Sequence, residues 1–224
     1  MLTRSLFTRS ALGRSALAGL IAAPLMTAIA APTALAGSDV EDPWLIRVRA
    51  INVMPDEDAT ITPIGGSVEI ENQIVPELDI SYFLSENFAF ELILATTPHD
   101  VSAVGTTVGN VDLGDVWLLP PTLTAQYHFA PRASVRPYIG AGINYTIFYN
   151  EDPGAVTSID YDNSLGFALQ AGVDVPVGDT YFLNLDVKKV FLSTDVSINA
   201  GGTAVSADVD IDPWIVGVGI GRRF

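Results

Sequence analysis

The sequence predicts an all-β fold, an eight-stranded antiparallel transmembrane β-barrel with short turns at one end and long loops at the other. Three observations predict it. Apolar and polar residues alternate with a period of two, short and long connections alternate along the chain, and the polar faces carry charges in the middle of the strands. No segment after residue 36 approaches 18 uninterrupted apolar residues, which excludes helical membrane spans.

The period of two defines the strands. In PELDISYFL, for example, Glu77 and Asp79 alternate with Leu78 and Ile80, so one face of the strand is polar and the other is apolar. Eight such runs are expected, at residues 44–54, 76–84, 88–96, 117–129, 135–149, 164–175, 180–192 and 212–224.

The connections between these runs indicate how the strands are arranged. Three are short, at residues 85–87, 130–134 and 176–179. Four are long and hold most of the acidic residues, at 55–75, 97–116, 150–163 and 193–211. Because short and long connections alternate, every tight turn lies at one end of an up-and-down barrel and every long loop at the other.

A soluble barrel of the lipocalin type would share this meander, with apolar side chains inside and polar ones outside. The alternative is the inverted arrangement of a membrane barrel, with polar side chains in the lumen and apolar ones facing lipid. Strands of about ten residues, aromatic residues near strand ends and the loop asymmetry favour the membrane barrel. The charges expected inside are Arg47, Arg49, Glu77, Asp79, Glu91, Asp174, Asp186 and Lys188. The possible partners of Arg47 and Arg49 are Glu77, Asp79 and Glu91, and the sequence leaves the choice open.

The first 36 residues have the features of a secretory signal peptide. MLTRSLFTRSALGR carries three arginines, an apolar stretch broken by Pro24 follows, and Ala34-Leu35-Ala36 forms a small-x-small cleavage signal. We therefore expect a signal peptide at residues 1–36 and the barrel at 37–224. The mature chain then has eight basic residues against 26 acidic ones, a formal charge of −18. Such a charge excludes a nucleic-acid partner, because binding phosphates requires a basic patch.

The sequence shows neither a catalytic motif nor a metal-binding motif. His99 and His128 stand apart, with no nucleophile motif beside them, so we expect no enzyme activity. The chain has no cysteine and no histidine cluster, so neither a transition-metal site nor a cofactor is expected. The acidic stretches 55–60 and 208–212 lack the glycine and glutamate of an EF-hand, and are interpreted as solvated loops rather than calcium sites.

Four strings then point to a family: WLIRVRAINVMPDEDA, LPPTLTAQYHF, VRPYIGAGINYTIFY and the terminal DPWIVGVGIGRRF. Together they resemble the OmpW family of eight-stranded outer-membrane proteins, which includes relatives associated with alkane uptake. The resemblance covers nearly all of the mature chain. It implies a location in the outer membrane of a Gram-negative bacterium, with short periplasmic turns and long extracellular loops.

The resemblance also implies a function, the passive uptake of small hydrophobic molecules. In the family a hydrophobic upper lumen leads to an opening in the barrel wall, from which the passenger leaves sideways into the membrane. The implied partners are outer-membrane lipid and lipopolysaccharide, the barrel assembly machinery and a small hydrophobic substrate. The rival hypothesis is a barrel that transports nothing and serves as a structural element or as a receptor for phage or bacteriocins.

Candidate channel-lining residues follow from matching positions of this chain to those of the family. Ile93 matches an apolar waist residue of the family, whereas Lys188 stands where the family often has an aromatic one, which motivates the rival hypothesis. By inward parity, the other channel-lining candidates are Ile51, Val53 and Phe148. Pro120 and Pro121 cannot donate ladder hydrogen bonds, so they indicate either a lateral opening or a strand start.

The chain ends on Phe224, and a terminal aromatic residue resembles the signal by which assembly machinery recognises barrels. Trp214, Val216, Val218 and Ile220 share its parity and form an apolar face. Arg222 interrupts that face where the family commonly has tyrosine, so we expect its side chain to extend to the periplasmic interface.

Overall fold

The computed structural model describes residues 40–224, and the expected signal peptide with its cleavage site near Ala36 lies outside the described residues. The described chain consists of β-strands and their connections. The strands are β1 (Trp44–Met54), β2 (Asp58–Thr62), β3 (Ser67–Ile70), β4 (Gln73–Phe83), β5 (Phe88–Ala95), β6 (Thr97–Thr106), β7 (Gly109–Leu119), β8 (Thr122–His128), β9 (Arg136–Asp152), β10 (Ser158–Tyr161), β11 (Ser164–Val177), β12 (Tyr181–Phe191), β13 (Ser193–Ala200), β14 (Thr203–Asp210) and β15 (Trp214–Arg223).

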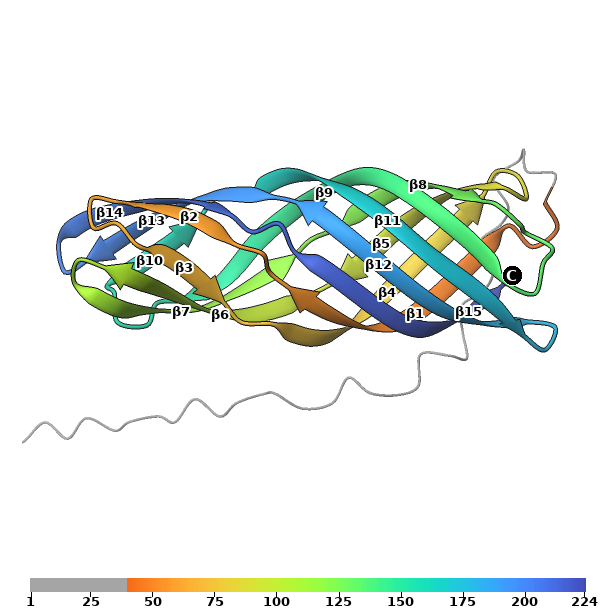
Figure 1. Cartoon of the computed structure of the whole chain (residues 1–224), viewed down its shortest axis with the longest axis horizontal. Helices are drawn as coiled ribbons and strands as arrows, with labels where there is room; N and C mark the ends of the chain where they lie inside the picture. The colour runs from red at the N-terminus through yellow and green to blue at the C-terminus, as the bar shows by residue number, and fades with distance from the viewer. Residues whose placement is uncertain (1–39) are drawn as a thin grey trace, which may run out of the picture. The chain divides into compact units, whose positions relative to one another are not determined.

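Eight of these strands close into a barrel, in the order β1-β4-β5-β8-β9-β11-β12-β15 (Figure 1). The first and last strands complete the ring, because β1 pairs with β15 from Leu45↔Arg223 to Met54↔Trp214. All neighbouring strands are antiparallel. The predicted eight-stranded antiparallel barrel is therefore confirmed. Closure satisfies the backbone donors and acceptors of every strand without leaving an edge.

The other seven strands lie within the long connections and lengthen the barrel at the end opposite the C-terminus (Figure 1). We call β2, β3, β6, β7, β10, β13 and β14 the extension. β10, β13, β14 and β2 form a four-stranded sheet, and β3, β6 and β7 continue from β9. The interior of the extension is apolar, with Ile61, Val101, Val116, Ile198 and Val209 in one buried cluster. The long connections thus form an apolar-lined continuation of the wall.

The outer face of the barrel is apolar between two marked levels. On β12 and β15, Lys189 pairs with Trp214 in register at one level and Tyr181 with Arg222 at the other, eight residues further along each strand. The outward residues between them are exposed and apolar: Leu183, Leu185, Val187, Val216, Val218 and Ile220. With about 3.3 Å per residue and a strand tilt of about 40°, this band is roughly 20 Å tall, close to the apolar band of membrane barrels. No helix among residues 40–224 is long and apolar enough to cross a membrane.

Glycines on the inner face of β15 make room for arginines of β1. Residues 217, 219 and 221 all point inward, and a Cβ at Gly219 would lie 2.2 Å from the Val48 carbonyl oxygen. A Cβ at Gly221 would meet the Arg47 side chain at 2.9 Å. The alternation of glycine with valine and isoleucine in WIVGVGIG therefore serves two faces, lipid outside and arginine side chains inside.

One predicted strand differs from the structure. The run expected at 117–129 is divided at Pro120 and Pro121 into the end of β7 and the whole of β8. Proline has no N–H to donate to a ladder, and the pairing with β5 and β6 is interrupted at these two positions. The register with β9 continues across them, and Tyr145 N–H donates to the Pro121 carbonyl at 3.0 Å.

Candidate functional site

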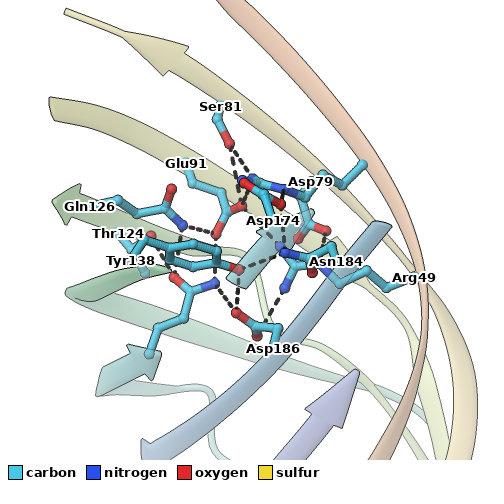
Figure 2. A network of polar contacts seen from close by, with 12 residues as sticks. Arg49, Asp79, Ser81, Glu91, Thr124, Gln126, Tyr138, Asp174, Asn184 and Asp186 are labelled. Atoms are coloured by element: carbon cyan, nitrogen blue, oxygen red, sulfur yellow. Dashed lines mark hydrogen bonds and ion pairs between the residues drawn. The ribbon is translucent and has the colours of Figure 1, made fainter. Parts of the chain in front are cut away.

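The half of the lumen nearest the tight turns is filled by a network of buried polar side chains, which we call the polar plug (Figure 2). Its members are Arg47, Arg49, Glu77, Asp79, Ser81, Glu91, Thr124, Gln126, Tyr138, Gln170, Asp174, Asn184, Asp186 and Lys188. They come from β1, β4, β5, β8, β9, β11 and β12, so the network ties nearly the whole ring together.

The two arginines of β1 reach across the lumen. Arg47 contacts Asp174 of β11 through Nη2 and Oδ2 at 2.6 Å, and Glu91 of β5 through Nη1 and Oε1 at 2.8 Å. The side chains of both arginines are fully buried, so solvent does not screen their ion pairs. The pairing with Asp174 was not among the partners considered from sequence, because Arg47 reaches it only when the barrel closes.

Arg49 takes the partners that sequence had left open. Its Nε lies 2.8 Å from Asp79 Oδ2, its Nη2 3.0 Å from Glu91 Oε1 and its Nη1 3.5 Å from Glu77 Oε1. It also pairs with Asp186 of β12 at 2.9 Å. Glu91 is thereby shared by both arginines, and its other oxygen accepts hydrogen bonds from Gln126 and Gln170 at 2.7 and 2.8 Å.

Carboxylates outnumber cations in the polar plug. Arg47, Arg49 and Lys188 face five acidic side chains, namely Glu77, Asp79, Glu91, Asp174 and Asp186. Amide and phenol donors supply part of the difference. Tyr138 donates from its hydroxyl to Asp186 at 2.7 Å, and Asn184 donates to Asp174 at 2.9 Å. The side chains of the network fill this half of the lumen. The cost of removing their charges from water is offset by the ion pairs and hydrogen bonds that they make with one another.

Above the polar plug lies an apolar pocket that continues into the extension. It has a volume of about 80 Å³, the space of several water molecules, so it is a small cavity. Its lining includes Ile51 and Val53 of β1, Ile93 of β5, Phe148 of β9 and many residues of the extension. Phe148 stacks on Tyr161 with their planes 11° apart.

Lys188 and Glu77 form the floor of this pocket, because both belong to its lining and to the polar plug. Lys188 donates from Nζ to Glu77 Oε1 at 2.6 Å and lies 3.0 Å from Asp186 Oδ1. The ammonium group is thus neutralised where it borders the apolar space.

Most polar side chains elsewhere in the lining already have protein partners. His99 donates from Nδ1 to the Glu71 carbonyl at 2.9 Å, and its Nε2 lies 3.0 Å from the Thr97 hydroxyl. Thr146 donates to Asn144 at 2.8 Å, and Thr194 donates to the Asp162 carbonyl at 2.7 Å. The pocket therefore offers few hydrogen-bonding groups to a guest.

A break in the wall lies beside the pocket. The β5–β8 ladder ends at Ile93↔Thr122, and the β6–β7 ladder begins at Thr97↔Leu118. Between them neither Pro120 nor Pro121 can donate, and Thr96 bridges part of the gap by donating from its hydroxyl to the Leu118 carbonyl at 3.2 Å. Ala95, Thr97, Pro120 and Thr122, which surround this break, all line the pocket.

Comparison with known proteins identifies the fold and the family. The sequence profile described as the OmpW family matches residues 41–224. The chain belongs to the OmpW family. It is 41% identical to the outer-membrane protein y4mB of Sinorhizobium fredii, over 99% of this chain and 97% of that protein. It is 31% identical to the dibenzothiophene metabolism operon protein PahQ of Pseudomonas aeruginosa, over 82% of this chain and 90% of PahQ.

A solved structure supports the same conclusion. The crystal structure of the outer-membrane protein OprG from Pseudomonas aeruginosa aligns with a TM-score of 0.75 and 27% identity, covering 81% of this chain and 95% of OprG. This OmpW-family barrel is accordingly an outer-membrane protein of a Gram-negative bacterium, seated in membrane lipid. Its tight turns and C-terminus mark the periplasmic end, and the extension is extracellular.

The structure places the residues singled out from sequence as follows. Ile51, Val53, Ile93, Phe148 and Lys188 all line the pocket of this OmpW-family barrel. Pro120 lines it as well, whereas Pro121 does not, and Thr122 directly after them starts β8. Phe224 pairs with Trp44 through two backbone hydrogen bonds of 2.8 and 3.1 Å. Their roles in conduction, exit and assembly stay predictions.

Sequence reasoning missed the lining that the extension contributes. His99 was expected in a loop but lies on β6, buried and facing the pocket. The acidic stretches near 55–60 and 208–212 are largely strand, with Asp58 paired to Asp210 between β2 and β14. A period-two signal was present there, since Val205, Ala207 and Val209 alternate with polar residues. Among residues 40–224, no group of three or more acidic, histidine or cysteine side chains is placed to hold a metal.

Proposed function

We propose that this OmpW-family barrel is a passive channel for small hydrophobic molecules, which enter through the extension and leave sideways into the membrane. The observation that carries the proposal is that the pocket, the polar plug and the ladder break adjoin one another. An apolar pocket is floored by the polar plug and borders a break in the β-ladder at Pro120 and Pro121.

The chemistry of the pocket favours uncharged, apolar guests. Its walls are aliphatic and aromatic, and the hydroxyl and imidazole groups of Thr97, His99, Thr146 and Thr194 are committed to protein partners. A molecule that needs hydrogen bonds would lose those it makes with water and find few in return, at about 1–3 kcal/mol for each unsatisfied group. A hydrocarbon loses nothing comparable.

A relative's name agrees with this selectivity. PahQ, 31% identical, is a protein of a dibenzothiophene metabolism operon. Dibenzothiophene is a flat, apolar heteroaromatic compound, which is the class of guest that the pocket lining favours.

The polar plug supports a sideways exit. Fourteen buried polar side chains close the periplasmic half of the lumen, so a hydrophobic guest that continued along the axis would have to displace ion pairs. Movement through the ladder break reaches hydrocarbon directly. The lipid outside is also the solvent in which such a guest is most stable.

Uptake of dibenzothiophene into proteoliposomes tests the channel. We expect faster uptake with the protein than with a small barrel whose lumen is filled, and a large reduction in I93W, because tryptophan fills the pocket at the waist. Val218→Trp, on the lipid face, is the matched control. Folding of each variant is checked by the different migration of unboiled and boiled protein in detergent gels. Equal uptake by wild type, I93W and the filled barrel would favour the rival, a structural barrel or receptor without transport.

A second pair of substitutions tests the exit separately. Replacing Pro120 with Thr and Pro121 with Val restores two backbone donors beside the break. We expect the pocket to fill as before while release into the bilayer slows. If release is unchanged, the lateral exit is wrong. The uptake of I93W then still tests the channel itself.

We also propose that the barrel assembly machinery recognises Phe224. It lies at the periplasmic end of β15, the strand that closes the ring against β1. Lipopolysaccharide is the proposed neighbour of the extracellular end, where the extension meets the outer leaflet.

A further inference from the structure

Three of the four arginines near the periplasmic turns and C-terminus differ from the other cations of the described chain. Residues 40–224 contain eight lysines and arginines, and five of them have a carboxylate oxygen within 4.0 Å: Arg47, Arg49, Arg132, Lys188 and Lys189. The three without one are Arg136, Arg222 and Arg223, all at the periplasmic end. Arg136 and Arg223 donate instead to the backbone carbonyls of Ala133 and Asp42 at 3.1 and 3.0 Å. Arg222 is then the guanidinium group most open to an anion from outside the protein.

Arg222 is the one of the three that faces lipid. It is exposed and shares the outward parity of Val218 and Ile220, whereas Arg136 and Arg223 have the inward parity of their strands. Its guanidinium carbon lies 4.8 Å from the centre of the Phe224 ring and 5.9 Å from that of Tyr181. The two rings hold the group at the lower edge of the apolar band by cation–π contact.

The opposite edge of the same band provides a comparison. Lys189 lies 5.2 Å from the Trp214 ring, in the same relation to its aromatic neighbour as Arg222. The ammonium group of Lys189, however, lies 3.0 Å from Asp56 Oδ2 and donates to the Asp212 carbonyl at 2.5 Å. Lys189 at the extracellular edge thus has a carboxylate partner from the protein, whereas among residues 40–224 no carboxylate lies within 4.0 Å of Arg222 at the periplasmic edge.

We propose that Arg222 binds the phosphate of a phospholipid headgroup in the periplasmic leaflet. The roughly 20 Å band places Arg222 where hydrocarbon gives way to headgroups. A planar guanidinium can donate two parallel hydrogen bonds to phosphate oxygens, and the bond strengthens where water is scarce. The bound lipid would lie against β12 and β15, next to the strand pair that closes the barrel.

Native mass spectrometry of the purified barrel in detergent tests this site, with phosphatidylglycerol as the probe. Diacylglycerol with the same acyl chains controls for chain binding. We expect wild type to retain phosphatidylglycerol and R222Q to retain it about tenfold more weakly, with diacylglycerol unaffected, because R222Q loses the charge-assisted hydrogen bonds to the phosphate. R222K keeps the positive charge but loses the planar pair of donors, so its retention of phosphatidylglycerol should lie between those of wild type and R222Q.

Arg136→Gln is the matched control, because it removes an equally unpaired arginine of the same end that faces the lumen. Equal loss in R136Q and R222Q, or no loss in R222Q, would overturn the proposal. Inorganic phosphate separates the two sources of the anion. If millimolar phosphate displaces the lipid completely, a free anion and not a headgroup occupies the site, and the proposal fails. Gel migration of unboiled protein confirms that each variant is folded.

Discussion

Lys188 Nζ donates a 2.6 Å hydrogen bond to Glu77 Oε1 across the lumen, at the level where the apolar pocket meets the polar plug. Both side chains are almost fully buried. The pair explains how a lysine occupies the waist of a lumen lined with apolar residues. Its charge is matched from below by Glu77 and Asp186, so the pocket above it remains apolar in character.

Replacing Lys188 with Met should be more destabilising than replacing Glu77 with Gln. The first change leaves five carboxylates facing two cations, and removing one partner of a buried pair costs about 3–5 kcal/mol. The second leaves four carboxylates facing three cations and relieves part of the excess. Urea unfolding in lipid vesicles measures both free energies. An E77Q variant that loses as much as K188M would show that the excess of carboxylates has no energetic consequence.

Gly219→Ala should impair the barrel more than Gly217→Ala. A Cβ at position 219 would lie 2.2 Å from the Val48 carbonyl oxygen and 2.7 Å from Arg49 Cα, so the backbone of β1 must move. At position 217 the nearest atom is a side-chain methyl of Ile51 at 3.0 Å, which can rotate away. We expect a cost of about 1–3 kcal/mol for G219A, measured by unfolding, with G217A close to wild type. Equal effects would contradict the close approach of β15 to β1.

The β6–β7 hairpin of the extension should become more stable as the pH falls. The hydrogen bond with Asp100, together with nearby negative charge, raises the pKa of Asp115 above its usual value. A carboxyl whose pKa is raised by folding stabilises the folded state below its unfolded pKa, and this contribution is lost as the pH rises through the folded pKa. The amide protection factors of residues 97–119, which correct for the slower intrinsic exchange at lower pH, should therefore rise on acidification from neutral pH, and D115N should remove that rise. A D115N variant that keeps the full pH response would refute the assignment.

Phe224→Ala should reduce the yield of assembled barrel in cells while leaving the folded protein stable. The backbone pairing of Phe224 with Trp44 does not need the ring, but recognition by assembly machinery is expected to. Quantifying heat-modifiable protein in outer-membrane fractions measures the yield, and refolding into detergent in vitro measures stability. Normal yield in cells would remove Phe224 as an assembly signal.

Arg222→Tyr, in contrast, should leave assembly unimpaired. Tyrosine suits the interfacial edge of the apolar band, next to Tyr181. The same outer-membrane fractionation should give a yield within error of wild type. Loss of assembled protein in R222Y would mean that the arginine acts in folding as well as at the lipid face.

The barrel itself could be predicted because its signal is local. The inward and outward parities of β1, β4, β5, β8, β12 and β15 follow from alternation within single strands, and a buried charge such as Arg47 or Asp79 stands out against its apolar neighbours. Inward parity also predicted that Ile51, Val53 and Ile93 face the lumen, and these residues line the pocket, while their part in conduction stays a prediction. In the acidic connections, abundant Asp and Glu conceal the alternation of inward and outward residues in β13 and β14. Gly201 and Gly202, both with positive φ, mark the tight turn between those two strands.

The sequence by itself thus determined the eight strands of the barrel, their two faces, the compartment and which of their residues point inward, since each depends on a period of two or on a short motif. Only the tertiary structure decided which charges meet. Arg47 and Asp174 are 127 residues apart and come into contact because β15 closes on β1 and brings β11 within reach across the lumen. Closure also set the position of the ladder break beside the pocket and left Arg222 without a carboxylate partner. Partner choice depends on barrel diameter and strand stagger, which are properties of the closed ring and of no single strand.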